Sequence, residues 1–216
     1  KEVAAAAGAV VRNEPLQGKG NVVRRMFSDV EADVYVLVDG DDTYDAASAP
    51  RLVRHLLENS LDMVNGARKT EIELAYRPGH RFGNVMLTRL VSAFFGSRIN
   101  DLLSGYRIFS RRFVKSFPAL SSGFEIETEF TVHALELNMP IGELETPYKD
   151  RPEGSESKLR TFSDGFRILK TIGILVKEER PLQFFSCLFA LLALLSVVLG
   201  WPVVTEFVDT GLVPRF

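Results

Sequence analysis

An acidic segment at residues 39–45 offers the clearest chemistry in this sequence, and it directly follows a valine-rich run at residues 34–38. Within it, Asp39 and Asp41 are two residues apart, with Asp42 beside them. Carboxylates at that spacing can converge on one hard cation, and Mg²⁺ or Mn²⁺ is typically held by one or two carboxylates plus phosphate oxygens of a substrate. The pair is therefore a candidate site for a metal-bound phosphate ligand, and a solvated acidic turn is the alternative interpretation.

Three other kinds of metal- or phosphate-binding motif match this sequence less well. A calcium-binding EF-hand loop needs glycine at its sixth position and an acid at its twelfth, where this chain has Tyr44 and Pro50. An aspartyl-phosphate phosphatase shares the pattern Asp-x-Asp-x-Thr, which residues 39–43 match, but its second acidic pair has no convincing counterpart. The Gly-Lys-Gly sequence at residues 18–20 lacks the remainder of a Walker phosphate loop.

A basic stretch further along the chain contains a candidate phosphate ligand. Residues 68–115 hold ten lysines and arginines and three acids, a surplus of seven positive charges. Such a surface suits an anionic lipid. Within it, Arg107 is a candidate ligand for phosphate, because a planar guanidinium binds phosphate bidentately and stays charged at any cellular pH. A surface ion pair is the alternative.

Two polar segments complete the candidates. Glu125 and Glu127 are two residues apart, so an extended backbone would put both on one face, where they could orient ligand groups. Alternatively, they cap a helix predicted at residues 128–137. Arg151 and Lys158 bracket a Gly- and Ser-containing stretch that has the composition of a mobile loop closing over phosphate, or of a solvated polar linker.

Alternating strand and helix patterns must position these residues. The run at 34–38 is typical of a strand in a parallel sheet covered on both faces, and ligands bind at the carboxyl edge of such sheets. Other segments predict helices at 4–9, 21–28, from 48, 77–95 and 162–176, and strands at 10–12 and 62–67. The last two helices are amphipathic, and the whole pattern predicts an α/β fold.

Length and composition narrow the class of protein. The chain has 216 residues, 46% of them hydrophobic, which is enough to bury the core of one domain. Its 26 basic and 28 acidic residues give a net charge of −2, so no overall positive field marks a nucleic-acid-binding protein. The single cysteine, Cys187, excludes an internal disulfide and a cysteine-based metal site.

The C-terminal region predicts a membrane anchor. Residues 182–199 are almost wholly apolar, and no charged residue occurs between Pro181 and Thr205, which is enough for one membrane-spanning helix. A buried core helix is the alternative. Basic residues precede this span and acidic residues follow it, so the positive-inside rule predicts that residues 1–180 face the cytoplasm.

Five separated segments occur in an order that resembles the family 2 glycosyltransferases of the dolichol-phosphate mannose synthase type. They are residues 12–24, 39–41, 100–107 (NDLLSGYR), 123–127 (GFEIE) and 151–158 (RPEGSESK). The resemblance covers nearly the whole chain and implies a GT-A fold, a Rossmann-like domain for nucleotide-diphospho-sugars. It also implies a nucleotide-sugar donor of the GDP-mannose or UDP-glucose type, Mg²⁺ or Mn²⁺, and inverting transfer to a polyprenyl (dolichyl or undecaprenyl) phosphate.

The resemblance assigns the acidic segment to the donor. It implies that Asp39 and Asp41 hold the metal and the donor diphosphate, that Asp42 is their neighbour, and that Lys19 lies near the nucleotide. A metal at this position would offset the charge that develops on the leaving diphosphate.

The resemblance assigns other residues to the acceptor. Asp101 is expected close to the transfer centre with Ser104, while Arg107 is expected to hold the acceptor phosphate together with Arg151 and Lys158. A lipid phosphate is already an anionic nucleophile, so transfer to it requires little or no general base.

The resemblance also implies the organisation of the chain. We expect a GT-A domain over residues 1–160 that lacks its first strands, a juxtamembrane amphipathic helix over 161–180 on the bilayer surface, a transmembrane helix over 181–204 and an extracytoplasmic tail over 205–216. The chain opens at Lys1 without a methionine or a visible signal peptide, which indicates a fragment. The expected location is the cytoplasmic membrane, or the endoplasmic reticulum membrane in a eukaryote, with the catalytic domain on the cytoplasmic side.

Three other functions remain open. A processive polysaccharide synthase shares the Asp-x-Asp domain, but its Gln-x-x-Arg-Trp motif is missing, because the single tryptophan, Trp201, lies in the predicted span. A glycosyltransferase with a non-lipid saccharide acceptor is the second. A catalytically inactive membrane adaptor of the same fold is the third, and the retained acids and Arg107 argue against it.

Overall fold

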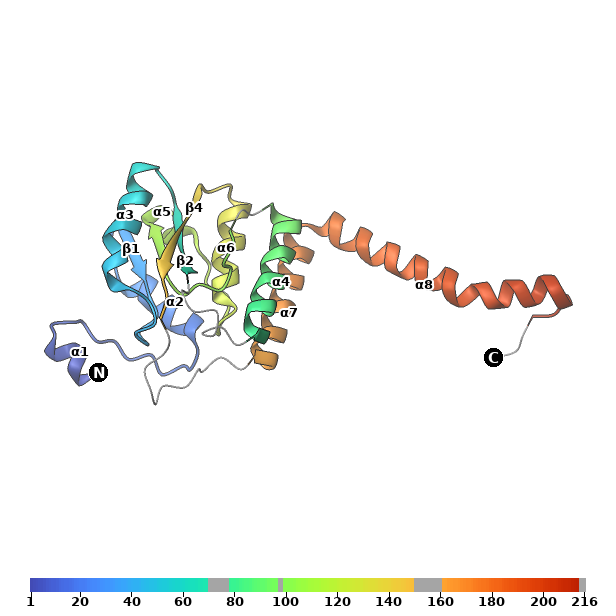
Figure 1. Cartoon of the computed structure of the whole chain (residues 1–216), viewed down its shortest axis with the longest axis horizontal. Coiled ribbons are helices and arrows are strands. Elements are labelled where there is room, and N and C mark those ends of the chain that lie inside the picture. Colours follow the sequence, from blue (N-terminus) through green and yellow to red (C-terminus); the bar gives the residue numbers. More distant parts are fainter. Residues whose placement is uncertain (70–77, 97–98, 150–160, 214–216) are drawn as a thin grey trace. The chain divides into compact units, whose positions relative to one another are not determined.

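A computed structural model describes residues 1–69, 78–96, 99–149 and 161–213 of the chain. The chain divides into two compact units, Lys1–Ile172 and Gly173–Phe216. Its elements, in chain order (Figure 1), are α1 (Glu2–Ala6), α2 (Lys19–Asp29), β1 (Val34–Leu37), η1 (Ala46–Ser48), α3 (Ala49–Glu58), β2 (Met63–Lys69), α4 (Pro78–Phe95), β3 (Arg107–Ser110), α5 (Arg111–Ser116), α6 (Ile126–Glu136), β4 (Ile141–Pro147), α7 (Thr161–Glu179) and α8 (Pro181–Thr210).

The first unit is built on a mixed four-stranded sheet with the order β1-β3-β2-β4. Strand β3 runs antiparallel to both of its neighbours, and Ile108 pairs with Val36 on one side and Val64 on the other. Strands β2 and β4 run parallel. The prediction that residues 34–38 belong to a parallel arrangement is therefore wrong, because β1 pairs antiparallel with β3. An apolar run reports burial, whereas strand direction depends on the strands that pair with it.

Strand β3 shows how both faces of the sheet are covered. Side chains alternate along a strand, so Ile108 and Phe109 point to opposite faces. Ile108 packs with Leu52 and Leu56 of α3. Phe109 packs on the other face in an aromatic cluster with Phe27, Phe113, Phe117 and Phe130. Figure 1 shows α3 on one side of the sheet and α6 on the other, which is the layered arrangement of an α/β domain.

Most of the predicted elements form, with shifted ends. The strand expected at 62–67 is β2, and the helices expected at 21–28, from 48, at 77–95 and at 162–176 are α2, α3, α4 and α7. Residues 10–12 form no strand and are exposed, so no partner strand or core selects an extended conformation there. The sequence patterns do not predict β3, α5 or β4; β3 has only four residues, too few for a periodicity to show.

The second unit contains α8, a helix of 30 residues that is apolar all round and buries none of its side chains. Among the described residues, it is the one helix long and apolar enough to cross a membrane, judged by length and composition. At about 1.5 Å per residue, the helix exceeds the ~30 Å of a bilayer's hydrocarbon core. The exposed apolar side chains do not support the alternative of a buried core helix.

Candidate active site

The start of α2 places a lysine between two carboxylates from distant parts of the chain. The Lys19 Nζ atom lies 2.7 Å from Asp39 Oδ1, at the carboxyl end of β1, and 2.6 Å from Glu127 Oε1, in the first turn of α6. Lys19 is largely buried and Glu127 is buried, whereas the Asp39 side chain is 35% exposed. The cluster therefore ties three segments together and presents Asp39 to solvent.

Two carboxylates around one ammonium give this cluster a formal excess of negative charge. Burial by itself would lower the pKa of Lys19, but Glu127 and Asp39 outweigh it and raise that pKa above its ordinary value. Burial also raises the pKa of Glu127, more strongly than the lysine lowers it. Lys19 consequently stays charged, and Asp39 is the carboxylate of this cluster that a cation from solvent can reach.

The two other acids of the segment have different partners. Asp41 is half-buried, and its Oδ1 atom accepts hydrogen bonds from the hydroxyl of Thr43 at 2.6 Å and from the backbone N–H of Thr43 at 3.4 Å. Asp42 adopts a left-handed backbone conformation, with φ at 58°, and forms an exposed ion pair with Lys149 at 2.9 Å. Asp39 and Asp41 are thus the better pair for a metal, and Asp42 is committed to a surface contact.

The donor atoms of Asp39 and Asp41 suit Mg²⁺ or Mn²⁺, which prefer carboxylate and phosphate oxygens. Within the described ranges, no group of three or more His, Cys, Asp or Glu side chains gathers as a metal-binding set. Two carboxylates would hold a divalent cation only with further oxygen ligands, which a diphosphate can supply. The residues therefore fit a metal that binds together with a diphosphate.

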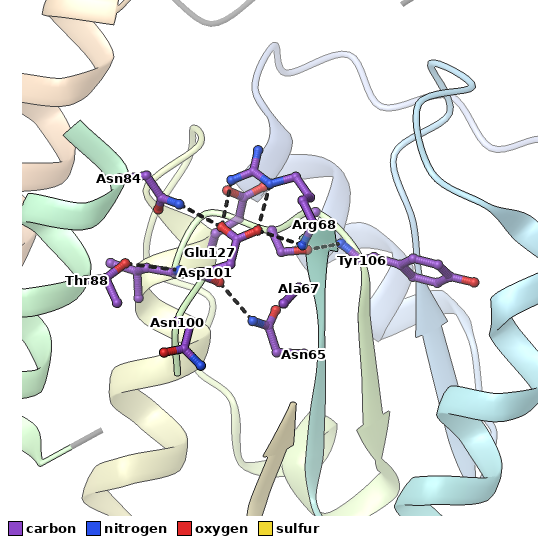
Figure 2. Close-up of polar contacts among 12 residues, drawn as sticks. Asn65, Ala67, Arg68, Asn84, Thr88, Asn100, Asp101, Tyr106 and Glu127 are labelled. Atoms are coloured by element: carbon purple, nitrogen blue, oxygen red, sulfur yellow. Dashed lines mark hydrogen bonds and ion pairs between the residues drawn. The ribbon is translucent and has the colours of Figure 1, made fainter. Parts of the chain in front are cut away.

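A third carboxylate, Asp101, is surrounded by hydrogen-bond donors (Figure 2). The Nε and Nη2 atoms of Arg68 each lie 2.7 Å from its oxygens, the backbone N–H of Arg68 donates at 3.1 Å, and Asn84 Nδ2 donates at 2.9 Å. Burial would raise the pKa of Asp101, but Arg68 and Asn84 outweigh burial and hold it below its ordinary value. Asp101 is therefore a buried carboxylate that stays ionised and whose acceptor positions are occupied.

Glu143 on β4 fixes the backbone beside Asp101, and the sequence does not single it out. Its carboxylate accepts hydrogen bonds from Asn100 Nδ2 and Asn65 Nδ2, both at 2.7 Å, and from the backbone N–H of Asn100 at 3.0 Å. Asn65 Nδ2 also donates to the carbonyl of Asp101 at 2.8 Å. The signal for this role is the strand register, which pairs Asn65 with Glu143 and is visible only in the folded chain.

The turn before β3 is held by buried polar contacts, and Arg107 is one of them. Ser104 Oγ donates to the carbonyl of Gly66 at 2.6 Å. The Arg107 guanidinium is fully buried and donates to the carbonyls of Leu102 at 2.7 Å and Ser104 at 3.2 Å. It also donates to the hydroxyl of Thr131 at 3.1 Å, and burial lowers its pKa.

The burial of Arg107 excludes the interpretation of a surface ion pair. Its guanidinium is bound to two carbonyls and a hydroxyl, and the expected contact with an acceptor phosphate stays a prediction. The physical reason is that the five N–H donors of a guanidinium fit backbone carbonyls as well as phosphate oxygens, so residue type alone does not separate the two uses. Ser104 likewise directs its hydroxyl to the backbone of β2.

Glu125 and Glu127 do not share a face. The carboxylate of Glu125 accepts the backbone N–H of Gly123 at 3.0 Å, whereas Glu127 lies on α6 against the lysine. The interpretation of an extended segment is wrong, and the helix expected nearby is confirmed. Glu125 holds its N-terminal cap position without a side-chain cap hydrogen bond. Arg151 and Lys158 lie outside the described residues.

Gly105 joins the lysine cluster to the turn that follows Asp101. A Cβ atom added at Gly105 would overlap the carboxylate of Asp39 and would lie 2.9 Å from Lys19 Nζ. The charge of Arg68, which is bound to Asp101, also acts on Glu127 and favours its ionised form. The two groups of charged residues therefore form one site.

No protein-family profile matches the chain, but several known proteins are similar to it in sequence. The glycosyltransferase AglJ of Haloferax volcanii is 34% identical over 192 residues, which are 86% of this chain and 62% of AglJ. A dolichyl-phosphate hexose transferase of the same organism is 28% identical over 179 residues, 83% of this chain and 77% of that protein. An uncharacterised Shigella flexneri protein is 64% identical over 115 residues, 53% of this chain and 71% of that protein. The chain thus spans less than two thirds of AglJ.

Solved structures share the fold. Crystal structures of glucosyl-3-phosphoglycerate synthase from Mycobacterium tuberculosis match with TM-scores of 0.61 and 0.63, at 21% and 20% identity. The match to the first of these structures covers 82% of this chain and 64% of the synthase chain. That crystal structure contains Mn²⁺, uridine diphosphate and glucosyl-3-phosphoglycerate. This likeness confirms the expected α/β fold of the GT-A type. The sequence relatives of the chain that carry a named activity are family 2 glycosyltransferases, and its structural neighbours are glycosyltransferases of the GT-A fold.

Proposed function

We propose that this protein is a membrane-anchored, metal-dependent glycosyltransferase that moves a sugar from a nucleotide-sugar donor to a polyprenyl phosphate, with inversion at the sugar carbon. The state of Asp101 carries the choice of acceptor. A sugar hydroxyl must lose a proton to a general base before or during attack. Asp101 is poorly suited to that task, because its oxygens already accept four N–H groups and its pKa is held low. A phosphate acceptor needs no base.

On the donor side, Asp39 and Asp41 would hold Mg²⁺ or Mn²⁺, which supplies positive charge to offset that of the leaving diphosphate. Lys19 fixes one oxygen of Asp39, and Thr43 fixes one oxygen of Asp41. The carboxylates are thereby held before the donor arrives, which lowers the cost of assembling the site. Asp42 remains a neighbour of this pair.

On the acceptor side, we assign the binding of the phosphate to basic residues that lie near the end of β4 or follow it in the chain. Arg68 forms an ion pair with Asp101, and its guanidinium group also lies over the ring of Tyr148. The guanidinium carbon is 5.5 Å from the ring centroid. Arg151 and Lys158 follow shortly after Tyr148 in the chain, and we assign them to the acceptor phosphate. Cations that bind the acceptor phosphate would keep it in line with the donor sugar.

The membrane anchor is proposed to be α8, with residues 181–204 in the bilayer, 205–216 beyond it and 1–180 in the cytoplasm. The GT-A domain is assigned to residues 1–160 and the juxtamembrane helix to 161–180. Exposed apolar side chains on α4 and α7 support contact with a bilayer surface. They are Val85, Met86, Phe166 and Leu169.

The test is a transfer assay on the full-length protein in membranes, with a panel of radiolabelled nucleotide-sugars. Polyprenyl phosphate, the same polyprenol without phosphate and a soluble saccharide serve as parallel acceptors. We expect label in the lipid fraction with polyprenyl phosphate alone, and its loss when a chelator is added. Label in the soluble saccharide alone would favour a saccharide acceptor. No transfer from any donor to any acceptor would favour the inactive adaptor.

A further inference from the structure

Tyr44 links the charged groups of the site, although the proposed chemistry does not use it. The residue is 7% exposed, and its ring packs edge-on against Tyr106 and Tyr148, with ring centroids 5.6 Å and 5.1 Å away. A backbone bridge pairs Tyr44 with Tyr148, and the N–H of Lys149 donates to the carbonyl of Thr43 at 3.0 Å. The ring is therefore fixed between the acidic segment, the turn before β3 and the end of β4.

The hydroxyl group of Tyr44 binds the backbone that lies against Asp39. Its oxygen accepts the backbone N–H of Gly105 at 2.7 Å. Burial raises the pKa of Tyr44 far above its ordinary value, so the phenol stays neutral. The charges of Arg68, Glu127 and Asp101 all act on this hydroxyl. The Tyr44 oxygen is thus within the electrostatic reach of both carboxylate groups while it holds one backbone N–H.

That N–H belongs to a residue whose backbone is closely packed against the site. A side chain at Gly105 would overlap Asp39, so its backbone lies directly against the Asp39 carboxylate. Gly105 also lies in the turn that begins at Asp101. A displacement of Gly105 would therefore change the separation of Asp39 from Asp101.

We infer that the Tyr44 hydroxyl is a positioning group, which holds the Gly105 N–H and so sets the spacing between Asp39 on the donor side and Asp101 on the acceptor side. The consequence for catalysis rests on the proposed function, because donor and acceptor must be aligned and small displacements lower the rate of transfer. The effect on the structure is independent of the proposed function, because a buried N–H that loses its acceptor must move or admit water.

The first experiment compares Tyr44→Phe with Tyr35→Phe in the full chain by hydrogen exchange and mass spectrometry. Tyr35 is a matched control, because it is 8% exposed and its hydroxyl accepts one backbone N–H, that of Ala32, at 3.0 Å. We expect Tyr44→Phe to speed amide exchange in peptides covering residues 101–107 by about tenfold. The control should leave these peptides unchanged. This readout requires no enzymatic activity.

The second experiment measures transfer by the same two variants. Thermal unfolding is recorded first, and both variants are assayed at a temperature where both are folded. We expect Tyr44→Phe to lower kcat by about 10- to 100-fold while the donor KM changes by less than about threefold, and Tyr35→Phe to stay near wild type. If the wild type transfers no sugar, the proposed function fails and hydrogen exchange alone decides the inference. Unchanged exchange at residues 101–107, or equal kcat for the two variants, would overturn it.

Discussion

Asp39 and Asp101 are two carboxylates of one site in opposite electrostatic situations. Asp39 is 35% exposed and shares a single lysine with Glu127. Asp101 is 6% exposed and accepts four N–H groups from Arg68 and Asn84. An aspartate carboxylate therefore keeps part of its negative charge uncompensated at Asp39, whereas at Asp101 all of its acceptor positions are occupied. Unmet charge at a half-exposed position marks where a cation and its ligand bind, whereas saturation marks the framework that positions them.

The largest effect is expected on stability, from breaking the ion pair that compensates the buried Asp101. Arg68→Met leaves Asp101 buried without its cation, which should lower the free energy of unfolding by roughly 3 to 5 kcal/mol. The adjacent Lys69 gives a control, because its ion pair with Glu145 has the same 2.7 Å length but its side chain is 65% exposed. Lys69→Met should cost at most about 1 kcal/mol. Chemical unfolding of both variants measures this, and equal losses would refute the distinction between the two carboxylates.

Breaking the unsaturated side should affect activity and leave stability nearly unchanged. Asp41→Asn removes one of the two metal carboxylates and should lower transfer by about 10²- to 10³-fold, or ~3 to 4 kcal/mol in the barrier. Asp42→Asn is the matched control, because that acid is used in an exposed pair with Lys149, and it should stay within a few-fold of wild type. Steady-state rates at saturating Mn²⁺ decide between them. The assignment fails if Asp41→Asn keeps full activity in the presence of chelator.

An intermediate effect is expected at Arg107, which belongs to the framework in this account. Arg107→Lys keeps a positive charge but cannot reach Leu102, Ser104 and Thr131 with one rigid fork, so buried carbonyls lose donors and stability should fall by about 1 to 3 kcal/mol. Thermal unfolding and acceptor saturation curves measure the two consequences. A large rise in the acceptor KM at unchanged stability would instead return Arg107 to the acceptor phosphate.

The smallest effect is a dependence of stability on pH. The pKa of Asp101 is lowered from its ordinary 3.8 in the folded protein, so its ionised form stabilises the fold. That contribution is complete above about pH 5 and is lost as the pH falls through the folded-state pKa below 3.8. The difference in unfolding free energy between wild type and Asp101→Asn should therefore be constant from about pH 7 to 5 and shrink in more acidic buffer. A difference that grows with acidity would show that Asp101 is not saturated.

Long apolar patterns were sufficient to predict much of the fold. The strand before Asp39, the helices α3, α4 and α7 and the apolar helix α8 all follow from runs or periodicities in the chain. Strand direction and the four-residue β3 do not, because pairing and very short elements leave no periodic signal.

The sequence indicated which residues belong to the candidate site better than it indicated which residues they contact. Asp39 and Asp41 stand out as a charged motif, and the family resemblance points to Lys19. The ion pair of Lys19 with Glu127 joins residues 108 apart in the chain, however, and no local pattern encodes it. Glu143 is similar, since its role comes from a strand register. Arg107 differs from both, because its residue type predicts a contact with phosphate, whereas the structure shows its buried guanidinium bound to a backbone carbonyl.

The central claim is that Asp39 and Asp41 bind a divalent metal jointly with a diphosphate. Electron paramagnetic resonance of Mn²⁺ tests it directly, with wild type and Asp41→Asn each measured alone and with uridine or guanosine diphosphate. Because two carboxylates are an incomplete ligand set, we expect weak Mn²⁺ binding by the protein alone, much tighter binding with a diphosphate, and no such gain in Asp41→Asn. Equal Mn²⁺ affinity in the two proteins, or tight binding that needs no diphosphate, would contradict the account.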